Sequence, residues 1–292
     1  MKKKLSTGCN FTQTPSWKKQ EGKREGSPGI WRVVCVSIVL LFLCLSVPGV
    51  GWAEENFFQI INDSNIPVNP NFVDDEGYAV YVSYEGKKFL MDTGGIEENL
   101  IQNMKAAGIL LDNLDFVFLT HRHPDHTGGL TYIRSKRPSL PIYIPPGGGF
   151  YNSKGLIELE DHLRISPNVF LIHTHNESGS RGITDELSLL IKTKKGPYVL
   201  SGCSHTGFDT ILEESKRVAE QNIFFHSGGT SLNRASETKI RATVKKIKAL
   251  RVTQVSPSHC SVGDRVQKPF KEIYGTNYIP SILGQKVPLE PR

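Results

Sequence analysis

The sequence of 292 residues predicts an α+β fold in which two β-sheets pack face to face and helices cover the outer faces. Three observations favour this class. Apolar runs of strand type occur in both halves of the chain, and helical runs lie between the later strands of each half. Strict alternation of strand and helix, which a doubly wound parallel sheet requires, does not extend along the chain.

The strands are predicted from short runs of β-branched and aromatic residues that Gly, Pro, Asn or Asp bound. A hairpin is expected over 78–94, with its turn at Glu85 and Gly86. The other predicted strands are 56–63, 115–120, 141–145, 169–175, 187–193, 198–202 and 223–228.

Helices are predicted where apolar residues recur at intervals of three and four. The first is expected over 96–108, where Gly108 is a typical C-cap. A second is expected over 126–138, where Pro138 stops it. Two further helices are predicted over 209–221 and 234–250.

The N-terminus has the order of a targeting segment. Residues 1–32 are rich in Lys and Arg, residues 33–47 form an uncharged apolar run, and small residues follow up to Ala53. We therefore expect a signal peptide over 1–53, a single domain over 54–292, and an exported protein that is periplasmic or secreted. The alternative is a membrane anchor formed by residues 33–47 and left uncleaved.

The charge of the chain resides in that N-terminal segment. The whole sequence has a formal net charge of +6, and the first 53 residues hold eight basic and two acidic side chains. The remainder is therefore neutral, with 27 residues of each sign. Because no basic stripe with interleaved aromatic residues is present, nucleic acid is not an expected partner. A small-molecule substrate is expected, with membrane contact only through the N-terminal segment.

Four potential metal ligands stand together in 116-FVFLTHRHPDHTGGL-130, directly after a predicted strand. In an extended segment, side chains two positions apart point the same way, so His121 and His123 can hold one ion. A proline then bends the chain, which lets Asp125 and His126 face a second ion. Imidazole and carboxylate are ligands of zinc and its neighbours, and two adjacent ions can activate a shared water.

The motif HxHxDH, with a buried strand before it and Thr-Gly-Gly after it, resembles that of the metallo-β-lactamase superfamily of metal-dependent hydrolases. The resemblance covers most of the chain after residue 53 and implies a four-layer αββα sandwich. The superfamily has an Asp-Thr-Gly after a hairpin strand, which matches 92-DTG-94 here. By this resemblance Asp92 braces the metal loop rather than binding an ion.

Three further segments resemble a narrower branch, that of dihydropterin-ribofuranosylaminobenzene phosphate synthase-like proteins. They are 199-VLSGCSHTG-207, 256-SPSHCSVG-263 and 274-YGTNYIPSILGQKV-287. The resemblance implies that His205 completes a first site with His121 and His123. It likewise implies that His259 completes a second site with Asp125 and His126.

The sequence departs from the wider superfamily at Cys203. Many members have a bridging aspartate at this point, whereas this chain has no carboxylate there until Asp209. Three alternatives follow: the Cys203 thiolate takes part, water alone joins the ions, or one site is weak. His175 is a rival to His205 as third histidine. His226 is a candidate for substrate contact, although it precedes its Gly-Gly turn, whereas the branch has it after the turn.

The resemblance implies a hydrolase in which a metal-bound hydroxide attacks an ester, lactone, amide or phosphoester bond. Two divalent ions are expected, with zinc favoured and iron or manganese as alternatives. Asp125 is the expected catalytic residue, because it can accept a proton from the attacking water. The alternatives are an iron-dependent redox enzyme acting on sulfur compounds or oxygen, and a non-catalytic binding module on the same fold.

Overall fold

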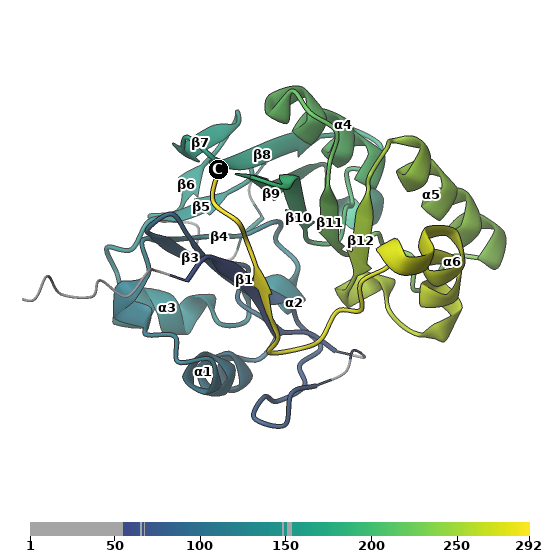
Figure 1. Cartoon of the computed structure of the whole chain (residues 1–292). Coiled ribbons are helices and arrows are strands. Elements are labelled where there is room, and N and C mark those ends of the chain that lie inside the picture. The colour runs from purple at the N-terminus through teal and green to yellow at the C-terminus, as the bar shows by residue number, and fades with distance from the viewer. Residues whose placement is uncertain (1–54, 65, 67, 148, 151–153) are drawn as a thin grey trace, which may run out of the picture. The chain divides into compact units, whose positions relative to one another are not determined.

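The first β-sheet is built mainly from the N-terminal half of the described chain (Figure 1). The structure is a computed structural model that describes residues 55–64, 66, 68–147, 149–150 and 154–292. The strand order is β13-β1-β2-β3-β4-β5-β6. The strands are β1 (Phe57–Asn62), β2 (Ala79–Tyr84), β3 (Lys87–Met91), β4 (Phe116–Phe118), β5 (Ile142–Ile144), β6 (Ile157–Glu158) and β13 (Lys286–Pro288).

The second sheet has the order β12-β11-β10-β9-β8-β7. Its strands β10, β11 and β12 are parallel to one another, whereas β7 to β10 are joined antiparallel. The strands are β7 (Leu163–Ser166), β8 (Val169–His175), β9 (Asp185–Thr193), β10 (Gly196–Ser201), β11 (Phe225–Gly228) and β12 (Gln254–Pro257).

Helices lie on the outer faces of both sheets (Figure 1). On the first sheet they are α1 (Glu97–Ala106) and α3 (Leu130–Lys136), with the short α2 (Pro124–Thr127) at the sheet edge. On the second they are α4 (Phe208–Ala219), α5 (Glu237–Ala249) and α6 (Asp264–Tyr274). Single 3-10 turns are η1 (Leu111–Asn113), η2 (Ser180–Gly182), η3 (His259–Ser261) and η4 (Gly275–Asn277).

The alternation of side chains along β9 explains why there are four layers. Leu187, Leu189 and Ile191 point into the core between the two sheets, while Leu190 points outward to the apolar faces of α4, α5 and α6. Because both faces of β9 are buried, apolar residues occupy four of the five positions from 187 to 191, and Ser188 is the exception. The ring of Phe58 in the first sheet lies 5.9 Å from that of Phe225 in the second. The predicted α+β sandwich is thereby confirmed.

The prediction of one continuous helix over 126–138 is wrong. The structure has α2 and α3 instead, separated at Gly128 and Gly129. The amide of Gly128 donates to Gly94 O at 2.8 Å and that of Gly129 to Thr93 O at 3.1 Å, so both bonds leave the helix. A Cβ on Gly128 would lie 2.2 Å from Gly95 O, and this close approach explains the glycine.

Several elements were not predicted, namely β6, β7, β12, α6 and β13. The strands among them have two to four residues, too few to display a periodicity, and α6 contains Pro269. The other predicted strands and helices occur within a few residues of their expected bounds. The predicted signal peptide and anchor lie outside the described residues.

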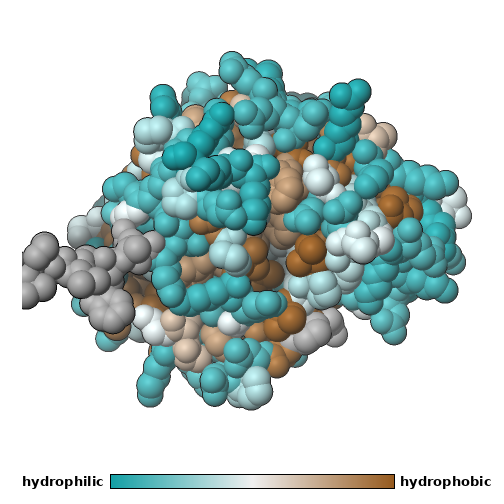
Figure 2. Space-filling view, in the orientation of Figure 1, coloured by the Kyte–Doolittle hydropathy of each residue, from teal (hydrophilic) through white to brown (hydrophobic). Residues whose placement is uncertain are grey.

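Hydrophilic side chains predominate on the face of the molecule seen in Figure 2. Among the described residues, no helix is both long enough and apolar enough to cross a membrane.

Candidate metal centre

Three loops that are remote in sequence meet at one edge of the sandwich. The first follows β4 and holds His121, His123, Asp125 and His126. The second follows β10 and holds Cys203 and His205, and the third follows β12 and holds His259. Each loop leaves the carboxyl end of a strand that has a parallel neighbour. Ligand sites of sheets with parallel strands form at such ends.

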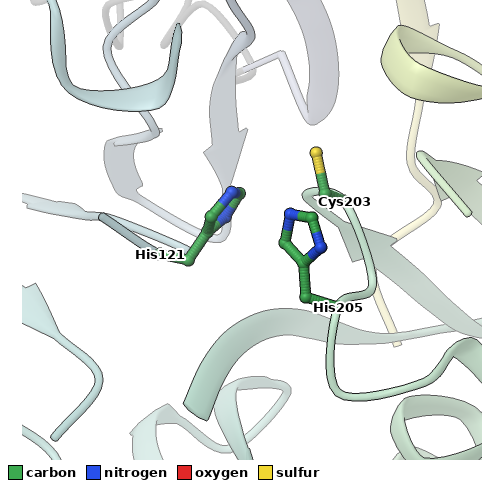
Figure 3. A group of neighbouring side chains, drawn as sticks. All are labelled: His121, Cys203 and His205. Carbon is green, nitrogen blue, oxygen red and sulfur yellow. The ribbon is translucent and has the colours of Figure 1, made fainter. Parts of the chain in front are cut away.

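One group of side chains surrounds His121. Its Nε2 lies 3.0 Å from Nδ1 of His123, and its ring centroid lies 4.8 Å from that of His205. The rings of His123 and His205 are also 4.8 Å apart. Figure 3 shows Cys203 and His205 rising from one loop, with His121 across from them. The potential ligand atoms of His121, Cys203 and His205 all lie within 4.8 Å of one another.

A second group surrounds His126. Its Nε2 lies 3.6 Å from Asp125 Oδ2, which in turn lies 3.4 Å from Nε2 of His259. Cys203 Sγ lies 3.4 Å from the same Nε2 of His126. The potential ligand atoms of His126, Cys203 and His259 again lie within 4.8 Å of one another.

The outward nitrogens of three rings have protein partners. His126 Nδ1 donates to Asp92 Oδ2 at 2.7 Å, His205 Nδ1 lies 2.8 Å from Ser180 Oγ, and His121 Nδ1 lies 2.9 Å from Thr120 Oγ1. A metal-binding histidine typically has its second nitrogen held in this way.

Two of the inward nitrogens have no hydrogen-bond partner. Nε2 of His205 and Nε2 of His259 are buried, and neither has a hydrogen bond. A buried polar atom without a partner costs about 1–3 kcal/mol, so its occurrence calls for an explanation. Divalent ions held by neutral imidazole, carboxylate and thiolate fit this set of atoms well.

Asp92 braces the loop that follows β4. Its Oδ1 accepts from the Thr120 amide at 2.7 Å, and its Oδ2 accepts from Thr120 Oγ1 at 2.9 Å as well as from His126. Asp92 has a φ of 60°, in the left-handed region that non-glycine residues rarely adopt. Strain of this kind is typical of functional sites.

The electrostatics of the first group favour neutral imidazoles. Burial keeps the pKa of His121 well below its ordinary value, with the neighbouring His126 adding to the effect. Burial, followed by the charge of His123, lowers the pKa of His205 to about 3. Neutral rings bind a metal ion without first losing a proton.

The second group behaves differently. Burial lowers the pKa of His259, but the contact with Asp125 outweighs it and raises this pKa to about 9. Burial raises the pKa of Asp125, but the contact with His259 at 3.4 Å and the charge of His126 together lower it well below its ordinary value. Without a metal, these two side chains form an ion pair. The contact with Cys260, and then burial, raise the pKa of the Cys203 thiol well above its ordinary value.

Three residues that contact histidines of the cluster were not predicted. Asp63 Oδ2 accepts from the His259 amide at 3.0 Å, and Tyr78 stacks on the His259 ring at 5.1 Å. Glu186 lies with Oε1 3.8 Å from His121 Nδ1, while its Oε2 accepts from the amide of Thr206 at 2.8 Å. Burial raises the pKa of Asp63, and likewise that of Glu186, to about 7. From sequence alone, a buried acidic residue beside a strand cannot be distinguished from an exposed one.

Two candidates lie outside the cluster. His175 is exposed at the end of β8, where its Nδ1 lies 2.9 Å from Asp185 Oδ1. His226 is buried in β11, with its Nε2 3.0 Å from Ser201 Oγ, and burial lowers its pKa to about 4. The His226 side chain does not line the cavity beside the cluster. Thus the structure brings His205, and not His175, to the motif.

A cavity of about 880 Å³ opens beside the cluster and reaches Asp125, Cys203 and His259. The basic residues in its wall are Arg181, Arg234 and Lys239, and hydroxyl groups add to its polar character. The acidic residues in the wall are Glu76, Asp125 and Asp209.

The sequence of residues 73–212 matches the family model of the metallo-β-lactamase superfamily. This segment includes the loop after β4 together with Cys203 and His205. Over these residues the chain is similar to the metallo-β-lactamase superfamily.

The chain is also similar to two proteins of known name. The 7,8-dihydropterin-6-methyl-4-(β-D-ribofuranosyl)-aminobenzene-5'-phosphate synthase of Methanocaldococcus jannaschii is 25% identical over 261 residues, which cover 72% of this chain and 88% of the relative. Hydroxyacylglutathione hydrolase 1 of Vibrio vulnificus is 26% identical over 105 residues, 34% of this chain and 41% of the relative.

The fold is shared with a solved structure. The crystal structure of a metal-dependent hydrolase of the β-lactamase superfamily aligns with 80% of this chain and 99% of its own, with a TM-score of 0.65 and 24% sequence identity. The four-layer sandwich expected from the resemblance is therefore the fold of this metallo-β-lactamase-like chain.

Proposed function

We propose that the protein hydrolyses an anionic small molecule with the help of two divalent ions, preferably zinc. The observation that carries the proposal is the meeting of five imidazoles and Asp125 from three loops beside one cavity, which Asp125 and His259 line. A surface cluster of histidines would not leave two buried nitrogens without partners.

In this proposal His121, His123 and His205 hold one ion, and Asp125, His126 and His259 hold the other. When bound, the ions lower the pKa of a water molecule and polarise the bond to be cleaved. The protein orients these ions through Asp92, Ser180 and Asp63, which hold three of the ligand residues from behind.

Asp125 has the role of proton carrier. The contact with His259 keeps its carboxylate ionised, and its side chain is 40% exposed toward the cavity. An ionised carboxylate beside the attacking water can accept a proton and pass it to the leaving group.

The charge of the cavity wall supports an anionic substrate. Asp209 forms an ion pair with Lys246, and Asp125 contacts His259, so Glu76 is the remaining acidic side chain in a wall that holds three basic ones. Among the described residues, no carboxylate forms an ion pair with Arg181, Arg234 or Lys239. Arginine and lysine in a cavity wall bind phosphate or carboxylate groups. The relative from Methanocaldococcus jannaschii is named for a product that bears a phosphate.

The test uses the full chain purified without added metal. We expect close to two divalent ions per chain and hydrolysis of at least one ester, lactone, amide or phosphodiester that bears an anionic group. His121→Ala should lower the rate by about 100-fold or more, since it removes a ligand. His175→Ala is the matched control, because His175 is an exposed histidine away from the cluster.

Two outcomes would contradict the proposal. Stoichiometric iron together with oxygen uptake would indicate the redox alternative. An unchanged rate in His121→Ala would indicate that the measured activity arises elsewhere.

A second candidate is a group-transfer or bond-forming reaction at the same ions, favoured by the synthase name of the relative that matches 72% of this chain. Product analysis separates the two, because only hydrolysis incorporates oxygen from labelled water into the product.

We also propose that the N-terminal segment exports the domain. Mass spectrometry of the protein recovered from expressing cells should find a new N-terminus after Ala53. An intact N-terminus in the membrane fraction would instead indicate the anchor.

A further inference from the structure

The loop after β10 puts a cysteine between the two groups of candidate ligands. It runs Gly-Cys-Ser-His over 202–205, and its nearest carboxylate, Asp209, forms an ion pair with Lys246 on the exposed side. No carboxylate of this loop therefore reaches the space between the two groups of ligands.

The sulfur of Cys203 is the atom that both groups share. It lies within 4.8 Å of the ligand atoms of His121 and His205, and also within 4.8 Å of those of His126 and His259. Its distance to His126 Nε2 is 3.4 Å. In a tetrahedral zinc site, sulfur and nitrogen ligands are about 3.5 Å apart, from bond lengths near 2.3 and 2.1 Å.

The loop holds this sulfur in place. Ser231 Oγ donates to the carbonyl of Cys203 at 2.7 Å, and Ser204 Oγ donates to Gly229 O at 2.7 Å. Ser204 has a φ of 57°, so the chain turns sharply immediately after the cysteine. A side chain on Gly202 would begin 2.4 Å from Thr120 Oγ1, so the loop lies directly against the strand end that leads to His121.

We propose that Cys203 is a thiolate ligand that bridges the two metal ions. Coordination displaces the thiol proton, which passes to solvent, and no electron is transferred. Thiolate prefers zinc or iron over manganese and magnesium, so the bridge also restricts which ions the site accepts. The inference rests on the proposed two-ion site.

Cys260 is the natural comparison. Its Sγ accepts from the Ser231 amide at 3.2 Å and lies 3.8 Å from the carbonyl of Cys203. It belongs to neither group of ligand atoms. Both cysteines are free thiols.

The experiment is cobalt titration of the metal-depleted full chain under reducing conditions. Cobalt(II) bound to thiolate has a sulfur-to-metal charge-transfer absorption in the near ultraviolet that imidazole and carboxylate do not produce. We expect this absorption to grow through both equivalents of cobalt, with the paramagnetic resonance signal of the pair weakened by spin coupling.

Three variants accompany the titration. Cys203→Ser should abolish the absorption and weaken binding of the second ion by about 100-fold. Cys260→Ser should retain the absorption. Cys203→Asp should bind two ions without the absorption, which also shows that the variant folds.

The possible outcomes distinguish a failure of the inferred thiolate bridge from a failure of the proposed function. Two bound cobalt ions without sulfur absorption overturn the bridge and leave the proposed function standing. Sulfur absorption that saturates at one equivalent of cobalt, with two bound ions that show no spin coupling, likewise overturns the bridge and leaves the proposed function standing. Failure of the wild-type protein to bind cobalt overturns both.

Discussion

The two halves of the metal centre are built in different ways. The half that follows β4 supplies four candidate ligands from one short loop, and Asp92 holds this loop through three hydrogen bonds. The half from the second sheet supplies Cys203, His205 and His259 from two loops, and a single bond from Asp63 holds the backbone of His259. The first half is therefore held by one carboxylate, whereas the second is held by separate contacts at each of its two loops.

The largest expected effect concerns the support beneath the first half. Gly128→Ala places a Cβ 2.2 Å from the carbonyl of Gly95, where backbone must move. We expect a loss of about 3 kcal/mol in the free energy of unfolding, measured by urea denaturation.

Gly108→Ala is the matched control for that change. Its Cβ would meet nothing within 4 Å, and only its φ of 69° disfavours alanine. A cost of about 1 kcal/mol is expected there. Equal costs at the two positions would show that the contact with Gly95 relaxes and that the first half is not rigid.

The second prediction compares the two braces directly. Asp92→Asn removes a carboxylate that holds Thr120 and His126, so metal affinity should fall about 100-fold. Asp63→Asn disturbs one bond to the His259 amide and should cost only about 10-fold. Competition with a coloured chelator measures both affinities, and a larger loss in Asp63→Asn would reverse the comparison.

The third prediction concerns pH. The contact with Asp125 raises the pKa of His259 to about 9, so below that pH an entering ion must displace a proton. The affinity for the ion at Asp125, His126 and His259 should rise about tenfold per pH unit up to about pH 9. Since burial holds the pKa of His121 and His205 low, the other ion should bind with little pH dependence over the same range.

The pH dependence of metal affinity is measured in the Cys203→Asp variant. In the wild-type protein the Cys203 thiol would also release a proton when an ion binds. Chelator competition from about pH 6 to about pH 9 gives the two slopes. Equal slopes for both ions would contradict the ion pair between His259 and Asp125.

The smallest effect is expected in the cavity wall, away from the ions. Arg234→Gln should raise KM for an anionic substrate by about 5- to 10-fold and leave kcat unchanged, because it removes binding that the ground state and transition state share. Lys245→Gln, on the exposed face of α5, is the control. A fall in kcat would indicate that Arg234 acts on the reacting atoms.

Local sequence patterns were sufficient to predict most of the helices and strands. The hairpin β2–β3, the strands β8 to β10 and the helices α1, α4 and α5 follow from periodicity and turn residues. The helix predicted over 126–138 failed because the amides of Gly128 and Gly129 bond to the loop after β3 rather than within the helix. These hydrogen bonds join segments that are distant in sequence, so the local sequence pattern does not reveal them.

The sequence by itself determined the resemblance to the metallo-β-lactamase superfamily and the metal loop, because His121, His123, Asp125 and His126 lie within six residues and the spacing of the side chains dictates their geometry. Tertiary structure decided the remainder. It directs His205, which follows β10, inward and leaves His175, at the end of β8, exposed, although both strands belong to the same sheet. It also brings Asp63, Glu186 and Cys203 to the site. Burial, neighbouring charge and the meeting of strand ends from two sheets set these roles, and none of them is a property of a single segment.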